Sequence, residues 1–351
     1  MKLKIKAVLF IGTYVLLLMC NSLNKIKYTT EVTYISDGTS YSEVLVYEGS
    51  RLSADKFFSS KSISSSNESS VNISNGIINA KQAGSALVCS EGKEILFRVF
   101  LRPCVTRKKY KIVVYKGSQI VTVYASDQNG NYNIPVKSML CSTGSEGKNE
   151  TICGTYSVRK HYRWQLLYGP CYGQYCTSFS PSYLFHSLPY SKISPDSVCD
   201  YELLGQKSSH GCIRLCVRDA KWIYEHCDVA STVIVTDEEY DVQIKPLRAI
   251  DDNRFYGWDP TDPDINNPYI YYGLQTEPIC EASGTRINLL KGETVKIPIY
   301  TTAKNIKVTS DNISVVKADN NAKITATGTG SCTVYIWGDD GSDCSIAVTV
   351  K

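Results

Sequence analysis

The sequence lacks the features that mark nucleotide, nucleic-acid or metal chemistry. It contains no glycine-rich phosphate loop and no basic run interleaved with aromatic residues, and 38 basic residues nearly balance 34 acidic ones for a formal net charge of +4. Such a balance does not favour nucleic acid or a strongly acidic polymer as a partner. Only four histidines are present and no CxxC pair occurs, so no zinc site is indicated. The sequence therefore predicts neither a nucleic-acid partner nor a bound metal.

The apolar stretch near the N-terminus is too short for a comfortable transmembrane helix. It spans residues 7–19, which is 13 residues, against the ~20 that a membrane-spanning helix needs. Three lysines among the first six residues precede it, and this order of charge before hydrophobe is typical of a secretory signal. Residues 1–25 are therefore predicted to be a signal peptide or an N-terminal anchor. Lipid attachment at Cys20 and an uncleaved membrane anchor remain alternatives, and all three interpretations place the rest of the chain outside the cytoplasm.

Fourteen cysteines in a chain predicted to be exported favour disulfide bonds. They are spread along the chain without a tight repeated spacing, so spacing alone does not define the pairing. Two pairs bracket short loops and are candidates for a bridge: Cys141 with Cys153, and Cys171 with Cys176. The pairing of the remaining cysteines stays open.

A length of 351 residues exceeds one ordinary domain, so two or three domains are expected. The two ends of the chain share a pattern of short strands with period two, broken by Gly, Asn and Asp turns. The N-terminal copy comprises residues 63–67, 79–88 and 95–100, and the C-terminal copy comprises residues 308–312, 325–334 and 345–350. This pattern is typical of β-sandwich modules, and both copies resemble bacterial Ig-like domains of group 2.

The most informative segment is SSHGCIRL at residues 208–215, taken together with HSLPY at residues 186–190. It places a cysteine directly after a His-Gly turn, and the second segment supplies a histidine 26 positions upstream (212 − 186). A thiol is a useful nucleophile only as thiolate, which near neutral pH requires a neighbouring base or a positive environment. The two segments resemble the signature of the L,D-transpeptidases with a YkuD-type catalytic domain, which remodel bacterial peptidoglycan.

The resemblance extends over residues 108–237 and is not confined to the motif. Upstream, two strands look like the family's opening hairpin, and a glycine-containing stretch looks like its StG…TPxGxY segment, with Ile152 where proline is usual. Downstream, a helix and a strand look like the family's closing elements. The matching stretches outside the motif are residues 112–115 and 119–124, residues 141–144 and 151–156, residues 219–224, and residues 232–235.

The resemblance implies a role for each residue of the motif. Cys212 takes the place of the nucleophile, where the alternative is a small buried hydrophobe. His186 takes the place of the general base, where the alternative is a satisfied core histidine. The backbone carbonyl of Ser187 takes the place of the acceptor that fixes the imidazole tautomer. His161 and His226 match no family motif and are expected at the surface.

The neighbours of the nucleophile have candidate roles of their own. His210 is two residues from Cys212, so in an extended segment both side chains point to the same face. It is predicted to orient the thiolate or polarise the scissile carbonyl, with a structural hydrogen bond as the alternative. The amides of Gly211 and Cys212 are candidates for an oxyanion hole. Arg214 is predicted to bind a stem-peptide carboxylate, with a surface salt bridge as the alternative, and Ser209 to supply a supporting hydroxyl at the substrate site.

The implied reaction is acyl transfer through a thioester between Cys212 and a tetrapeptide stem, which the side-chain amine of a second stem resolves to give a 3→3 cross-link. Peptidoglycan stem peptides are the expected donor and acceptor, carbapenem-type compounds are the expected inhibitors, and no cofactor is required. The expected location is the cell wall or cell envelope. Two alternatives remain: an L,D-carboxypeptidase in which water resolves the thioester, and a non-catalytic cell-wall-binding protein.

The expected fold is mainly β, with a YkuD-type β-rich catalytic domain of few helices flanked by two Ig-like β-sandwich modules. The predicted boundaries are residues 28–104 for the first Ig-like module, 108–237 for the catalytic domain, 238–279 for an ordered connector and 280–351 for the second Ig-like module. The connector shows no helix or strand period but carries aromatic residues, so it is expected to pack along the catalytic domain. An aromatic edge to the substrate groove is the alternative.

Overall fold

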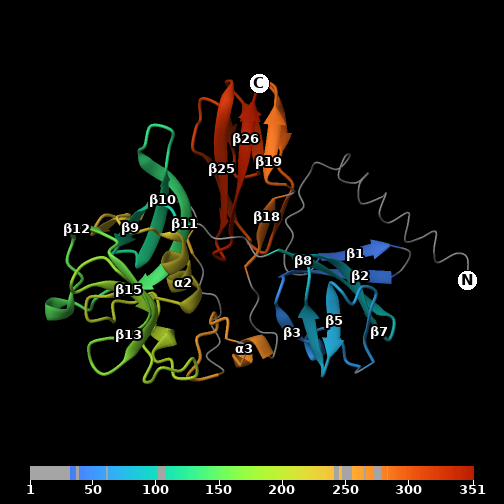
Figure 1. Cartoon of the computed structure of the whole chain (residues 1–351), viewed down its shortest axis with the longest axis horizontal. Helices are drawn as coiled ribbons and strands as arrows, with labels where there is room; N and C mark the ends of the chain where they lie inside the picture. Colours follow the sequence, from blue (N-terminus) through green and yellow to red (C-terminus); the bar gives the residue numbers. More distant parts are fainter. Residues whose placement is uncertain are drawn as a thin grey trace, which may run out of the picture.

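The structure is a computed structural model in which three β-rich bodies lie side by side (Figure 1). It describes residues 32–36, 39–60, 62–101, 107–240, 245–246, 255–264, 266–271, 278–282 and 284–351. The predicted signal peptide or anchor, Cys20 and Cys104 lie outside the described residues. Within these ranges, no helix combines the length and the apolar character needed to cross a membrane.

The central body, mainly green in Figure 1, is a nine-stranded sheet in the order β12-β17-β9-β10-β11-β16-β15-β14-β13. Its strands are β9 (Lys111–Tyr115), β10 (Ile120–Ser126), β11 (Tyr132–Ser142), β12 (Gly154–Ser157), β13 (Lys160–Leu166), β14 (Tyr172–Ser178), β15 (Leu184–Ser187), β16 (Ile213–Leu215) and β17 (Thr232–Thr236). Most neighbours run antiparallel, but β15 with β16 and β17 with β9 run parallel. The helix α2 (Val217–His226) follows β16. The expected hairpin, helix and closing strand are therefore present as β9–β10, α2 and β17.

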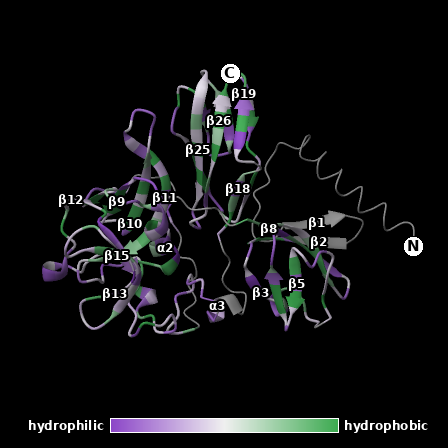
Figure 2. Ribbon diagram, in the orientation of Figure 1, coloured by the Kyte–Doolittle hydropathy of each residue, from purple (hydrophilic) through white to green (hydrophobic). Residues whose placement is uncertain are grey.

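Apolar side chains of the central sheet and of α2 form one continuous core. Ile112 and Val114 of β9 and Val121 and Val123 of β10 are shielded from solvent and share this core with Ile223 of α2. Burial of a side chain of this size stabilises the fold by about 1.5–3 kcal/mol. Figure 2 shows hydrophobic residues, in green, on the strands and polar residues, in purple, mainly on the connecting loops.

The N-terminal and C-terminal bodies each consist of two main sheets around one apolar core. The N-terminal strands are β1 (Val32–Ser36), β2 (Thr39–Tyr47), β3 (Arg51–Ser53), β4 (Ser64–Ser65), β5 (Val71–Ser74), β6 (Ile77–Ala80), β7 (Gly84–Ser90) and β8 (Lys93–Phe100). The C-terminal strands are β18 (Cys280–Ala282), β19 (Arg286–Leu289), β20 (Thr294–Lys296), β21 (Ile299–Thr301), β22 (Ile306–Ser310), β23 (Val316–Ala318), β24 (Lys323–Ala326), β25 (Gly330–Gly338) and β26 (Asp343–Val350).

The two flanking bodies have the same strand order. In the N-terminal body, β2-β8-β7-β4 lies in one sheet and β3-β6-β5 in the other, and in the C-terminal body the corresponding orders are β19-β26-β25-β22 and β20-β24-β23. One pair in each body is parallel, β2 with β8 and β19 with β26. The sequence repeat thus corresponds to a repeated topology. The expected mainly β fold, with a β-sandwich before and after the central body in the sequence, is confirmed. In space the C-terminal sandwich lies between the other two bodies (Figure 1).

The C-terminal sandwich docks on the central body through β11 and α2 (Figure 1). Trp337 of β25 is 1% exposed, and its Nε1 donates to the carbonyl oxygen of Pro135 at 3.0 Å. Lys137 of β11 is 2% exposed, and its Nζ lies 3.1 Å from Oδ1 of Asp343. The same carboxylate oxygen accepts a hydrogen bond from Nε1 of Trp222 at 3.1 Å. Loss of Asp343 would leave the buried ammonium group of Lys137 without its anion. The contact between the two bodies therefore depends on this carboxylate.

The described part of the connector packs on the central body, as expected. The N-cap residue of α2 has no side-chain cap, and Oδ2 of Asp259 in the connector accepts from the backbone N–H of Val217 at 2.8 Å instead. Oδ2 of Asp262 accepts from Nε2 of Gln174 at 2.6 Å. A short helix, α3 (Pro268–Tyr271), follows. The connector therefore supplies the anion that a helix N-terminus favours.

Replacing Asp259 with Ala is expected to lower the stability of the central body, because the first N–H of α2 and the amide of Thr261 lose a buried acceptor. Burial raises the pKa of Asp259 from 3.8 to about 6. The native state therefore binds the extra proton between these pH values, and the stabilisation that Asp259 provides falls as pH rises through them. The difference in unfolding free energy between the wild type and the variant should be about 3 kcal/mol larger near pH 3 than at pH 7.

Urea unfolding of both proteins across this pH range measures the difference. The exposed Asp55, replaced by Ala, is the matched control and should give little change. A stability difference that grows from pH 4 to pH 7 would contradict the burial argument.

Candidate active site

Parallel pairing of β15 with β16 joins the two halves of the motif. The register aligns Phe185 with Ile213 and His186 with Arg214, so the side chains of His186 and Arg214 project from the same face of the sheet. Cys212 lies two residues before Arg214, immediately ahead of β16, and a backbone hydrogen bond from Leu184 reaches its sulfur. The fold thus brings the imidazole and the guanidinium together, and the charge of Arg214 acts on both His186 and Cys212.

The turn that carries Cys212 is held by residues 143–145, which follow the end of β11. The amides of Ser208 and Ser209 both donate to the carbonyl oxygen of Thr143 at 3.0 Å. Within the turn, Oγ of Ser209 accepts from the Gly211 amide at 3.0 Å and donates to the Cys212 carbonyl at 2.6 Å. Ser209 is 1% exposed, so its hydroxyl shapes the turn, and the predicted substrate contact would require it to leave these partners.

Gly211 has a backbone φ of 113°, a value that residues other than glycine rarely adopt. A Cβ at this position would lie 2.8 Å from Cε1 of Tyr183. Oγ1 of Thr151 donates to the Gly211 carbonyl at 2.9 Å and accepts from the Gly144 amide at 2.8 Å. The two stretches that resemble the family's StG…TPxGxY segment therefore hold the turn through the hydrogen bonds of the Thr151 hydroxyl.

His186 is 2% exposed, and its Nδ1–H donates to the backbone carbonyl of Ser187. This bond selects the tautomer that leaves the Nε2 lone pair available as a base. Burial lowers the pKa of His186 from 6.5 to about 3, with a further lowering from the positive charge of Arg214. A Cβ at Gly173 of β14 would lie 3.0 Å from Nδ1, so a side chain there would displace the imidazole.

Cys212 and Arg214 influence each other electrostatically. Burial raises the pKa of the Cys212 thiol above its usual 9.0, and the hydrogen bond from Leu184 and the charge of Arg214 lower it in part. Arg214 is 8% exposed, and its Nη1 donates to the carbonyl of Ser208 at 3.2 Å. Burial thus disfavours the charged form of both the thiol and the imidazole. The predicted alternative of a surface salt bridge does not fit a side chain this well buried.

His210 is exposed at the rim of the site and packs against the ring of Tyr168 at a centroid distance of 5.3 Å. Tyr168 lies between β13 and β14 and is 82% exposed. Sequence reasoning missed this aromatic neighbour, because nothing near residue 168 indicates which loop the turn meets. The catalytic role of His210 stays a prediction.

His161 and His226, expected at the surface, are both partly buried, and that expectation is wrong. The ring of His226 stacks on Trp222 with centroids 4.2 Å apart, and His161 packs edge-on against Tyr224 at 5.4 Å. Both histidines therefore serve aromatic packing around α2.

Neither predicted loop disulfide is present, because the described cysteines all carry free thiols. Cys141 is fully buried in the central core, whereas Cys153 is exposed and its Sγ donates to Asp237 at 3.1 Å. Cys176 is also fully buried, and Sγ of Cys171 donates to the Tyr168 carbonyl at 3.4 Å. In each pair the two thiols have different surroundings. Within the described residues, no group of three or more His, Cys, Asp or Glu side chains is placed to hold a metal ion.

A family model described as the L,D-transpeptidase catalytic domain, YkuD, matches residues 109–235. This segment is an L,D-transpeptidase catalytic domain. The match includes Cys212, His186 and the strands and turn that position them.

The L,D-transpeptidase segment also has curated and structural relatives. YciB of Bacillus subtilis (strain 168), provisionally named as an L,D-transpeptidase, is 44% identical over 54 residues, which are 15% of this chain and 28% of YciB. A Clostridium acetobutylicum protein, titled as a fused Zn-dependent amidase/peptidase and peptidoglycan-binding domain protein, is 26% identical with a TM-score of 0.30, over 38% of this chain and 55% of its own. L,D-transpeptidase 3 of Mycobacterium tuberculosis, solved with a faropenem-derived adduct, is 17% identical with a TM-score of 0.28. The match covers 50% of this chain and 80% of the Mycobacterium tuberculosis chain. The match thus covers only about a quarter of the length of YciB and about half of the length of the Clostridium acetobutylicum chain.

The rate at which iodoacetamide alkylates Cys212 should keep rising with pH beyond 9.0, because burial raises the thiol pKa. Replacing Arg214 with Gln removes a charge that lowers this pKa, so alkylation at pH 8 should become slower. Peptide mass spectrometry gives the rate at Cys212 and, as an internal reference, at the exposed Cys153. A plateau reached below pH 7 would instead indicate a resting thiolate and imidazolium pair.

Proposed function

We propose that this protein is a peptidoglycan L,D-transpeptidase that forms 3→3 cross-links through a thioester on Cys212. The observation that supports the proposal is the β15–β16 register, which aligns the buried His186 with Arg214, two residues after the cysteine of the family's signature. Nε2 of His186 takes the thiol proton as sulfur attacks the carbonyl on the L-centre of the third stem residue. The same imidazole then protonates the leaving terminal D-alanine.

The surrounding groups suit the developing charges of this reaction. The Gly211 amide is bonded to Ser209, so the Cys212 amide is the better candidate to stabilise the oxyanion. The charge of Arg214 acts on the Cys212 thiol, and its guanidinium suits a stem-peptide carboxylate. His210 would orient the thiolate or help polarise the scissile carbonyl. The side-chain amine of the acceptor stem then attacks the thioester and completes the cross-link.

An L,D-carboxypeptidase differs only in the acceptor, since water would resolve the same thioester. A purely wall-binding protein is a third possibility. The buried His186, whose tautomer is fixed by the Ser187 carbonyl, is evidence against it. Product analysis separates the first two, because only transpeptidation yields a dimeric muropeptide with a 3→3 bond.

Replacing Cys212 with Ala should abolish both the thioester and the cross-linked product on purified tetrapeptide muropeptides, and Cys212→Ser should lose most of the activity because a hydroxyl ionises far less readily. Chromatography with mass spectrometry quantifies dimer, tripeptide and released D-alanine. Cys153→Ser, which changes an exposed thiol outside the turn, is the control and should keep wild-type activity. Wild-type turnover by Cys212→Ala would contradict the proposed mechanism.

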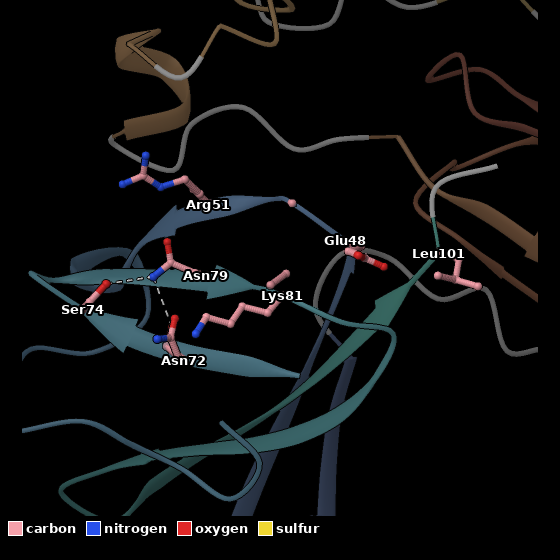
Figure 3. Close-up of a pocket in the computed structure, with 9 residues that line it drawn as sticks. Glu48, Arg51, Asn72, Ser74, Asn79, Lys81 and Leu101 are labelled. Carbon is pink, nitrogen blue, oxygen red and sulfur yellow. Dashed lines mark hydrogen bonds between the residues drawn. The ribbon is translucent and has the colours of Figure 1, made fainter. Parts of the chain in front are cut away.

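We also propose that the two flanking sandwiches are Ig-like modules of group 2 that bring the enzyme to the wall from outside the cytoplasm. A pocket of about 750 Å³ on the N-terminal sandwich supports this role (Figure 3). Its lining includes the cationic side chains of Arg51 and Lys81 and the amides of Asn72 and Asn79. Oδ1 of Asn72 is buried without a hydrogen-bond partner among the described residues. Cations and amides suit a polymer that carries carboxylates, hydroxyls and acetamido groups.

The double variant Arg51→Ser, Lys81→Ser should pellet less with purified sacculi while kcat/KM on soluble muropeptides stays unchanged, because the pocket is formed by residues outside the catalytic domain. The matched control is Lys296→Ser, Lys323→Ser on β20 and β24, which correspond to β3 and β6 in the other sandwich. Equal loss of pelleting in both double variants would indicate non-specific charge attraction rather than a pocket.

A further inference from the structure

Two cysteines of the C-terminal sandwich lie closer together than non-bonded thiols should. Sγ of Cys280 on β18 is 2.9 Å from Sγ of Cys344 on β26. A disulfide has an S–S length of about 2.05 Å, so a small shift converts this crowded contact into a covalent bond. Cys280 is 1% exposed, and neither residue belongs to the pairs that bracket short loops.

The backbone does not join the two strands that carry these cysteines. β18 pairs with β21, where Cys280 is opposite Thr301, and β26 pairs with β25, where Cys344 is opposite Ile336. The first pair is a separate two-stranded sheet and the second belongs to the four-stranded sheet. A cross-link between the two sulfurs would therefore connect two sheets that share no backbone ladder.

We propose that Cys280 and Cys344 form an intramolecular disulfide in the exported protein. The oxidant is an external disulfide, either low-molecular-weight or carried by a thiol oxidoreductase. The thiolate of the partly exposed Cys344 attacks one sulfur of that disulfide and releases its first thiol. The Cys280 sulfur then displaces the second thiol, so two S–H bonds and one external S–S bond break while one new S–S bond and two external thiols form.

The proposed bond lies between the two surfaces that join the C-terminal sandwich to the rest of the molecule. Ile279, next to Cys280, is fully buried against Leu45 and Tyr47 of the N-terminal sandwich. Asp343, next to Cys344, receives the hydrogen bonds from Lys137 and Trp222 of the catalytic domain. The disulfide would therefore fix one interface relative to the other, independently of the chemistry at Cys212.

The test uses the full chain incubated with oxidised glutathione, unfolded without reductant, alkylated and digested. A linked peptide pair containing Cys280 and Cys344 is expected, together with a loss of two mass units that reductant reverses. Reductant should lower the Tm of the wild type by about 5–10 °C, and should leave the Tm of Cys280→Ser, Cys344→Ser unchanged. Cys332→Ser on the neighbouring β25 is the control and should keep the wild-type response. Alkylation of both thiols after this oxidation would overturn the proposal.

Hydrogen exchange tests the coupling separately from the bond. Reduction should speed amide exchange in β11 and α2, where the catalytic domain meets Asp343, as well as in β18. Faster exchange in β18 alone would refute the coupling between interfaces. Cross-linking activity on soluble muropeptides is measured in parallel, so that a failure of the disulfide is distinguished from a failure of the catalytic assignment.

Discussion

The parallel pairing of β15 with β16 is the constraint on which the site depends. Its register sets His186 opposite Arg214 and leaves Cys212 at the open end of the shorter strand. A shift by one residue would turn His186 to the other face of the sheet, away from Arg214. Much of the surrounding structure secures this pairing: β11 flanks β16, β14 flanks β15, and α2 continues directly from β16.

Burial decides the electrostatics of the site. It raises the pKa of the thiol and lowers that of the imidazole, and the charge of Arg214 lowers both. Burial thus favours the neutral form of both groups.

The sequence predicted the parts of this account that are local. Period-two patterns indicated strands of the two flanking sandwiches, and the likeness to the family's opening hairpin indicated β9 and β10. The motif indicated Cys212 and His186, because a nucleophile and its base need particular residue types. The predicted carbonyl of Ser187 is where the structure places a hydrogen bond to Nδ1. Their catalytic roles and the domain boundaries stay predictions.

The features that depend on tertiary contacts could not be predicted. Asp259 caps a helix that begins 42 positions earlier in the chain, and no local pattern indicates that pairing. Gly173 gives His186 its space only because β14 lies beside β15. The loop-spacing argument for disulfides failed because Cys141 points into the core while Cys153 faces solvent. The close pair Cys280 and Cys344 is 64 positions apart.

The most direct measurement of the central claim is the site of acylation by a carbapenem. Intact-protein mass spectrometry after incubation with imipenem should give one adduct per chain, and a peptide digest should locate it on Cys212. His186→Ala should slow its formation strongly, because the buried thiol then has no base, and Cys212→Ala should not form it. An adduct that forms at the wild-type rate in Cys212→Ala, or that maps to another cysteine, would contradict the account.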